Sequence, residues 1–513
     1  MKILDQDSTK ASETNLLDLS SVRKICLMFE RSINRNREMR TKFGDQPEKF
    51  VDSEFELTEA IQSLTLLTQD PGKFYPEVVR LGVVVSLLGL LAHENVDIAI
   101  SVIEILEELT DEDILDAHQE DEEAEEEENE GKSKAPEAVM ELVNRLIEHQ
   151  LLELLVSTMV SRLNEKEEAE RNGVFHSLSL IENLISLDPY LSIQLIEKTP
   201  ILKFLLQRIK PTSSNRDGIP SSLAFQNQQY SSEICAILVQ SFSQNRRALV
   251  NEGGMDVLLE VLSIYRKRDP KDADEIEFME NVFDTLCSVL LEAEHKVKFL
   301  EGEGVELMVI MMKEKKLARS RSLKVLDHAL VGEEGVKNCE RFVEHLGLKT
   351  LFSAFMGKKN SNKISRFEDD EHILGILVSL FFNLESDSAS RLRLLAKFVE
   401  DGYEKVDRLL EIRESVEVRL SQRIEVQEME LDETEVYLSR LEAGLFSLQL
   451  IDTIIGWICM EDDGIKDHLK MLLKRNGKRL EDIIGVLVEY LESMGDGSKK
   501  DGIKCLVDYL AAL

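Results

Sequence analysis

Apolar and polar positions alternate along this chain with the spacing of amphipathic helices. Within residues 296–356 the apolar side chains recur three and four positions apart, at Leu307, Ile310, Met311, Leu323, Leu326, Ala329 and Leu330. A helix of 3.6 residues per turn gathers such positions into one stripe and leaves the charged residues on its other side. The pattern predicts helices that each bury a single face.

The aliphatic runs are introduced by glycine or proline, where the chain must turn between helices. They begin at Gly82, Pro200, Gly254, Gly304 and Gly347, and the last four are 54, 50 and 43 residues apart. A loose period somewhat above ~40–47 residues is typical of armadillo and HEAT repeats with loop insertions. One such repeat cannot bury its own apolar face, so neighbouring repeats must stack. We therefore expect an all-α fold, an α-solenoid of armadillo/HEAT-type repeats with helical N- and C-terminal caps.

Changes in composition divide this expected array. The chain carries nine acidic residues between positions 120 and 130, with no apolar periodicity, which predicts a disordered loop. The loop could only solubilise the protein, or it could attract basic tails or mask a basic groove. The predicted segments are a disordered N-terminus (1–18), an N-terminal helical cap (19–75), an armadillo array (76–400) with a disordered acidic loop (113–135), a charged long helix (401–441) and a C-terminal helical cap (442–513).

The charge balance restricts the class of partner. Lys and Arg number 62 and Asp and Glu 98, a net charge of −36. Phosphate backbones are bound through Lys and Arg, so direct nucleic-acid binding is not expected. A basic protein segment is the natural partner, although the charge could equally serve solubility alone. No run of about 18 uncharged apolar residues suggests a membrane span, and six scattered cysteines without a C-x-x-C pair fit a reducing compartment.

Motifs that would carry chemistry are missing from the sequence. Neither Gly131-Lys132 nor Gly477-Lys478 has the upstream glycine of a phosphate-binding loop. H-E-x-x-H, G-x-S-x-G and the kinase motifs are also missing, and the nine histidines are dispersed. We expect no enzyme activity, no metal and no cofactor.

Three segments resemble a known family. The runs EKKxxRSxSLKVLDHAxxGxEGxxNC (314–339), FLxGEGxxLM (299–308) and EAGLFSLQLID (442–452) are similar to the β-catenin-like protein 1 family, nuclear armadillo-repeat proteins associated with the spliceosomal NineTeen complex. The resemblance extends from about residue 19 to the C-terminus. It implies a nuclear protein of the pre-mRNA splicing machinery. Longer members carry a basic import signal near the N-terminus, whereas only Lys2 and Lys10 are basic here before Arg23.

In an armadillo array the last helix of each repeat lines a concave groove. Aligning those helices on their apolar pattern gives a polar row, which we call the groove row: Glu108, Asn183, Gln240, Ser288, His328 and Asn383. Amides at such positions resemble those that hold an extended peptide by its backbone groups. Flanking carboxylates could pair with Lys or Arg of that peptide, namely Glu104, Glu107, Glu182, Asp284 and Asp327. Each residue could equally be an ordinary solvated position, and His328 a structural histidine.

The favoured hypothesis is a non-enzymatic splicing scaffold that binds basic, import-signal-like segments of partner proteins, splicing factors of the NineTeen complex. An importin-type nuclear transport adaptor is the alternative, although importin-α has a ladder of tryptophans and Trp457 is the only one here. A weaker third hypothesis is RNA binding through the basic group at residues 31–42, which could also be a solvated helix face. The sequence leaves homo-oligomerisation open.

Overall fold

The computed structural model describes residues 17–111, 134–211, 221–314, 316–357, 363–427 and 433–513. Every regular element in these ranges is helical, which confirms the all-α prediction. The helices form two compact units, Met1–Ala248 (unit 1) and Leu249–Leu513 (unit 2). The acidic loop predicted at 113–135 and the N-terminus predicted at 1–18 fall almost wholly outside the described residues.

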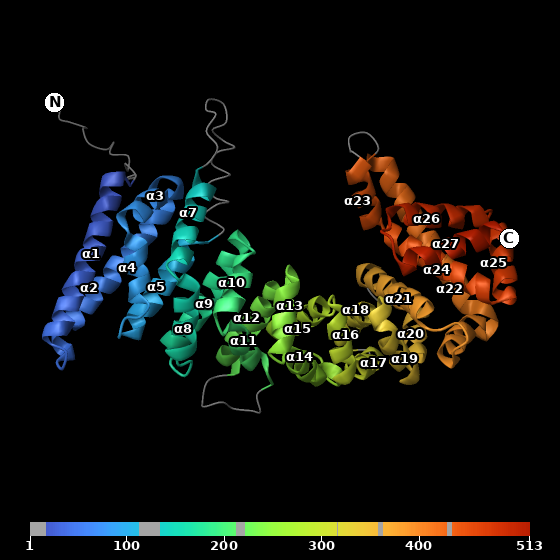
Figure 1. Ribbon diagram of the computed structural model, residues 1–513, viewed down its shortest axis with the longest axis horizontal. Helices are drawn as coiled ribbons and strands as arrows, with labels where there is room; N and C mark the ends of the chain where they lie inside the picture. The colour runs from blue at the N-terminus through green and yellow to red at the C-terminus, as the bar shows by residue number, and fades with distance from the viewer. Residues whose placement is uncertain (1–16, 112–133, 212–220, 315, 358–362, 428–432) are drawn as a thin grey trace, which may run out of the picture. The chain divides into compact units, whose positions relative to one another are not determined.

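Unit 1 begins with an α-helical hairpin and continues as a stack of helices, coloured blue to green in Figure 1. Its elements are α1 (Leu19–Lys42), η1 (Pro47–Lys49), α2 (Val51–Gln62), η2 (Ser63–Gln69), α3 (Pro71–Leu81), α4 (Val83–Leu90), α5 (Val96–Leu109), α7 (Ala135–Glu148), α8 (Leu151–Ser161), α9 (Glu168–Leu187), α10 (Leu191–Lys198), α11 (Ile201–Ile209) and α12 (Ser221–Gln240). Helix α13 (Ser243–Asn251) crosses the boundary between the units.

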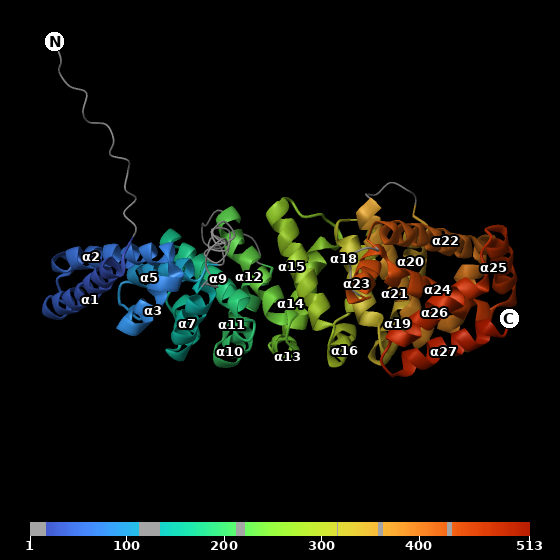
Figure 2. The same ribbon diagram turned by 90° about the horizontal axis from the view of Figure 1, so that it is seen from above.

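Unit 2 is coloured green to red in Figures 1 and 2. Its elements are α14 (Gly254–Ser263), η3 (Ile264–Arg266), α15 (Ala273–Val289), α16 (Ala293–Glu301), α17 (Gly304–Glu314), α18 (Ala318–Leu330), η4 (Glu333–Gly335), α19 (Val336–Glu344), α20 (Gly347–Phe355), α21 (Lys363–Asn383), α22 (Ala389–Gln427), α23 (Glu433–Ala443), α24 (Leu445–Glu461), α25 (Asp463–Arg475), α26 (Leu480–Ser493) and α27 (Ser498–Ala511).

The long last helix of each repeat packs against the long last helix of the next. In unit 1 this series is α5, α9 and α12, and in unit 2 it is α15, α18, α21 and α24. The apolar stripe predicted on α18 is correct, since Leu323, Leu326, Ala329 and Leu330 are fully buried. On α17 the predicted stripe is only partly correct: Met311 is buried as expected, but Leu307 is half-buried and Ile310 is 43% exposed, and Met308 and Met312 are buried instead.

The glycines that introduce the repeats of unit 2 are required by close packing. A Cβ at Gly304 would lie 2.3 Å from the ring of Phe299, and one at Gly347 would lie 2.5 Å from the ring of Phe342. Both glycines follow the aromatic residue by five positions and begin a helix. The side chain at the end of one helix therefore covers the first residue of the next, and only glycine leaves room for it.

The carbonyl ends of the long helices accept hydrogen bonds from side chains of elements later in the chain, an arrangement we call end closure. Asn183 Nδ2 donates to Glu107 O of α5 at 3.2 Å, and Asn245 Nδ2 donates to Leu238 O of α12 at 2.8 Å. Asn383 Nδ2 donates to Leu330 O and Gly332 O beyond α18, both at 2.8 Å. The guanidinium of Arg391 in turn donates to Phe381 O of α21. End closure thus satisfies terminal carbonyls that a helix cannot pair internally.

The segment predicted as one charged helix at 401–441 contains two helices and a sharp break. Helix α22 is interrupted at Glu400–Tyr403, where Asp401, Gly402 and Tyr403 have positive φ. The part of α22 after the break buries Val406, Leu409 and Val416 and packs on α24. This part of the segment therefore lies against the body of unit 2.

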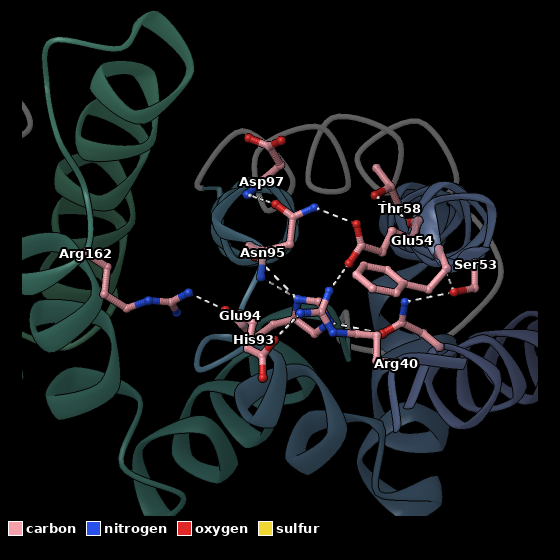
Figure 3. A network of polar contacts seen from close by, with 11 residues as sticks. Arg40, Ser53, Glu54, Thr58, His93, Glu94, Asn95, Asp97 and Arg162 are labelled. Atoms are coloured by element: carbon pink, nitrogen blue, oxygen red, sulfur yellow. Dashed lines mark hydrogen bonds and ion pairs between the residues drawn. The ribbon is translucent and has the colours of Figure 1, made fainter. Parts of the chain in front are cut away.

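A polar network fastens the N-terminal hairpin α1–α2 to the next helices of unit 1 (Figure 3). The guanidinium of Arg40 lies between the carboxylates of Glu54 and Glu94. Asn95 caps the start of α5 and also donates to Glu54 at 3.1 Å. To their left in Figure 3, Arg162 donates to the carbonyls of Leu91 and His93. The network ties together side chains from α1, α2 and the turn before α5.

Candidate partner-binding surface

In unit 1 the groove row and the carboxylates that flank it form a strongly acidic surface. Three consecutive polar positions at the end of α5 carry carboxylates, Glu104, Glu107 and Glu108, and Glu182 follows on the neighbouring helix α9. Glu104 and Glu107 are half-buried and Glu108 is exposed. We call these four residues the acidic cluster.

Among the residues that the structure describes, the basic neighbour of this cluster is an imidazole. His176 Nδ1 lies 2.6 Å from Glu107 Oε2, and its Nε2 lies 3.8 Å from Glu104 Oε1. The hydrogen bond to Glu107 raises the pKa of His176, while burial raises the pKa of Glu104. Glu108 accepts a hydrogen bond from Thr65 Oγ1 at 2.6 Å, and Glu182 accepts one from the hydroxyl of Tyr230. Hydroxyls add no charge, so the cluster stays negative even when His176 is protonated.

The carboxylates that flank the row in unit 2 contact basic side chains of the neighbouring long helix. Asp284 on α15 binds Lys324 Nζ of α18 at 2.7 Å. Asp327 on α18 binds His372 Nδ1 of α21 at 3.0 Å. Beside them Ser288 is half-buried. Asp284 therefore already has a lysine of the next repeat, and Asp327 has an imidazole of the next repeat.

Two of the remaining polar side chains of the row hydrogen-bond to the protein's own backbone. The amide nitrogens of Asn183 and Asn383 close the ends of α5 and α18, and are thereby engaged before any peptide arrives. Gln240 is exposed at the last position of α12, and its carbonyl accepts from Arg246 at 3.1 Å. Burial lowers the pKa of His328, so that its imidazole stays neutral near pH 7.

Sequence reasoning found the carboxylates but missed their partners. His176 lies seven residues before Asn183, two turns earlier on the same face of α9, so helical spacing could have placed it beside the row. The aromatic pair next to it was also missed. The rings of Phe175 and Tyr230 lie 5.0 Å apart, and the hydroxyl of Tyr230 reaches Glu182.

Part of the basic group at residues 31–42 already forms ion pairs within the protein. Arg35 pairs with Glu56 at 2.5 Å, and Arg40 lies between two carboxylates in the network of Figure 3. Lys42 lies over the ring of Phe43. The only tryptophan, Trp457, packs with Phe381 and Phe382 within unit 2.

Other kinds of site were sought in the same residues. Within the described ranges no group of three or more His, Cys, Asp or Glu side chains is arranged to hold a metal ion. No single described helix is long and apolar enough to cross a membrane; the bent pair Thr434–Ala443 and Leu445–Glu461 meets the length and composition test only jointly. Nearly every residue of α24 in that pair is buried inside unit 2, as expected of a core helix.

Comparison with known proteins gives a result that is consistent with the helical repeats described above. Residues 1–488 match a family described as "Catenin-beta-like, Arm-motif containing nuclear". Human β-catenin-like protein 1 is 38% identical over 502 residues, covering 94% of this chain and 83% of that protein, and the rat protein matches equally. The fission yeast β-catenin-like protein 1 homolog is 35% identical over 500 residues, covering 96% of this chain and 82% of that protein.

Proposed function

Because the chain belongs to the β-catenin-like protein 1 family of nuclear armadillo-motif proteins, we propose that it is a non-enzymatic scaffold of the pre-mRNA splicing machinery. It binds basic, import-signal-like segments of its partners, splicing factors of the NineTeen complex. The binding surface is the acidic cluster of unit 1. The observation that carries this proposal is the excess of carboxylates there over cations.

The acidic cluster suits a basic segment better than the unit 2 part of the row. Among the described residues, Glu104, Glu107, Glu108 and Glu182 share one imidazole, that of His176, whereas Asp284 has a lysine and Asp327 a histidine of its own. A Lys or Arg that approaches the cluster gains an ion pair without breaking an existing one. Approach to unit 2 would require displacing Lys324 or His372, which offsets the gain.

The aromatic pair beside the cluster supplies the apolar part of the site. Lys and Arg bury their aliphatic stems on apolar surface while the charged head stays with carboxylates and water. Phe175 is half-buried next to Glu182 and Tyr230, so a stem can lie on its ring. Cations also gain from lying over an aromatic face, by about 0.5–1 kcal/mol at exposed sites.

The test is a fluorescence-polarisation titration of a labelled basic, import-signal-like peptide of a splicing factor, at low and moderate salt. We expect saturable binding that weakens with salt. The variant E104Q/E107Q/E108Q should bind on the order of tenfold more weakly at low salt, since tenfold corresponds to about 1.4 kcal/mol shared among three carboxylates.

A matched control separates the cluster from net charge. The variant E137Q/E141Q/E197Q removes three exposed carboxylates from other surfaces of unit 1 and changes the total charge equally. It should bind like the wild type. Equal losses of peptide affinity in both variants would mean that binding depends only on the total charge of the chain. No loss of affinity in the cluster variant would contradict the proposed surface.

The splicing assignment has its own test. A tagged full chain should recover components of the NineTeen complex from nuclear extract, and the cluster variant should recover less. Recovery of an import carrier in place of splicing factors would instead favour the transport adaptor.

A further inference from the structure

The C-terminal end of unit 2 contains an open cavity of about 610 Å³ between α25, α26 and α27, the red helices of Figures 1 and 2. Its apolar lining comes from Leu473 of α25, Leu480 and Ile484 of α26, and Leu510 of α27. The volume falls within the range of about 300–1,000 Å³ typical of ligand pockets. The cavity is therefore large enough to receive side chains of a partner.

The rim of this cavity is basic although the chain as a whole is acidic. Lys470, Lys474 and Arg479 line it and form no ion pair within the described residues. A fourth cation of the lining, Lys478, is paired with Glu417. One carboxylate, that of Glu481, also lies at the rim. The unpaired charge at the cavity is thus positive, in a protein whose net charge is −36.

Stabilisation of α25 does not account for this arrangement. Cations in the last turn of a helix interact favourably with its dipole, and Lys474 and Arg475 serve that role. Lys470 lies a turn earlier and Arg479 lies beyond the helix, yet both line the same cavity as Lys474. The feature that these three cations share is their position around the apolar lining of the cavity, which we call the aliphatic floor.

We propose that this cavity binds an acidic segment of a partner protein that carries large aliphatic residues between its Asp and Glu side chains. The aliphatic side chains fill the floor formed by Leu473, Leu480 and Ile484, and the carboxylates pair with Lys470, Lys474 and Arg479. A charged rim around an apolar floor selects for both properties together. The site is independent of the acidic cluster in unit 1 and has the opposite polarity, so one chain can hold a basic and an acidic segment at separate places.

A protein segment fits the cavity better than a nucleic acid. Single strands are bound by stacking their bases on aromatic side chains, and the described lining contains leucine and isoleucine but no aromatic residue. Glu481 at the rim and the net charge of the chain both repel a polyphosphate backbone. A peptide with carboxylates between aliphatic residues needs no aromatic side chains for stacking. It is also repelled less than a polyphosphate backbone by Glu481 and by the net charge of the chain.

The experiment uses the full chain and a labelled peptide of about twelve residues in which Ile-Leu pairs are separated by Asp and Glu, an extended or helical ligand of the kind that docks in grooves. We expect saturable binding by fluorescence polarisation, weaker at higher salt. The variant K470E/K474E should bind the peptide at least about tenfold more weakly, which corresponds to about 1.4 kcal/mol. Binding of the basic peptide to unit 1 should be unchanged in this variant.

The matched control is K337E/K504E, which reverses two exposed lysines of unit 2 outside the cavity and should bind like the wild type. A peptide with alanine in place of Ile and Leu tests the floor on the unaltered protein, independently of whether a variant folds, and should bind at least about tenfold more weakly. The proposal is overturned if the wild type does not bind the peptide, or if K470E/K474E binds it as tightly as the wild type does. It is also overturned if the alanine peptide binds as tightly as the Ile-Leu peptide, or if single-stranded RNA of the same net charge displaces the peptide.

Discussion

Replacing Asp452 with asparagine should strongly destabilise unit 2. Asp452 of α24 is fully buried and Arg413 of α22 is 2% exposed. The guanidinium makes a bidentate contact, with Nε donating to Oδ1 at 2.7 Å and Nη2 donating to Oδ2 at 3.0 Å. Arg413 also donates to Glu417, which in turn binds Lys478. The substitution keeps the size of the side chain and removes its charge.

The magnitude follows from the cost of an uncompensated buried charge. Removing one partner of a buried ion pair typically costs about 3–5 kcal/mol. Asparagine can still accept one hydrogen bond from Arg413, and Glu417 remains as a second carboxylate, so we expect a loss of about 3 kcal/mol in the free energy of unfolding. The variant R413M/D452L removes both charges and should recover more than half of that loss, because apolar replacements of buried pairs are often neutral.

The assay can use the single tryptophan of the chain as a local probe. Trp457 is on the same helix as Asp452, five residues further along. Urea unfolding followed by its fluorescence reports on unit 2, and circular dichroism at 222 nm reports on all helices. The fluorescence midpoint should move to lower urea in D452N, while the part of the dichroism change that belongs to unit 1 should not move.

The control is D467N, which neutralises an exposed aspartate on α25. Surface substitutions of this kind usually change stability by less than about 0.5 kcal/mol. The reasoning is refuted if D452N and D467N have the same fluorescence midpoint, or if R413M/D452L is less stable than D452N.

Three further predictions concern single positions. In G347A the new Cβ would collide with the ring of Phe342, so thermal unfolding should show a loss of about 1–3 kcal/mol, whereas G485A, with nothing within 4 Å of its Cβ, should gain up to about 1 kcal/mol. In N383A the carbonyl of Leu330, at the end of α18, and that of Gly332, just beyond it, lose the amide donor of Asn383, at a cost of about 1–3 kcal/mol in urea unfolding; unchanged stability would refute end closure. The pKa of His176 is raised, so its pairing with Glu107 stabilises the fold below about pH 6.5, and this stabilisation is lost as the pH rises through the folded-state pKa. The stability difference between wild type and H176Q should therefore shrink between pH 6 and pH 8. Over the same rise in pH, binding of the basic peptide to the acidic cluster should strengthen.

The repeat architecture could be predicted from sequence because its signals are local. Helical spacing of apolar residues is set within a few turns, and the glycines at 254, 304 and 347 begin helices as expected. The reason for the last two glycines was different from the one inferred. A turn was expected to demand their flexibility, whereas a phenylalanine five residues earlier demands their lack of a side chain.

The ion pairs and hydrogen bonds around the groove row could not be predicted from the sequence, because they depend on contacts between helices. Glu107 and His176 are 69 residues apart, and Asp327 and His372 are 45 apart. Such pairs form only when adjacent helices stack with a particular offset, which apolar periodicity does not specify. The carboxylates beside the row looked alike in the sequence, yet they have different electrostatic surroundings in the two units.

The end closure described above gives the stack a direction. Loss of the repeat that follows a long helix would leave terminal carbonyls of that helix without their donors. Loss of the repeat that precedes it would release only a side-chain amide such as that of Asn183, which can turn to water. A fragment of this protein is therefore better begun at a repeat boundary than ended at one. Partial unfolding should spread toward the N-terminus more readily than toward the C-terminus.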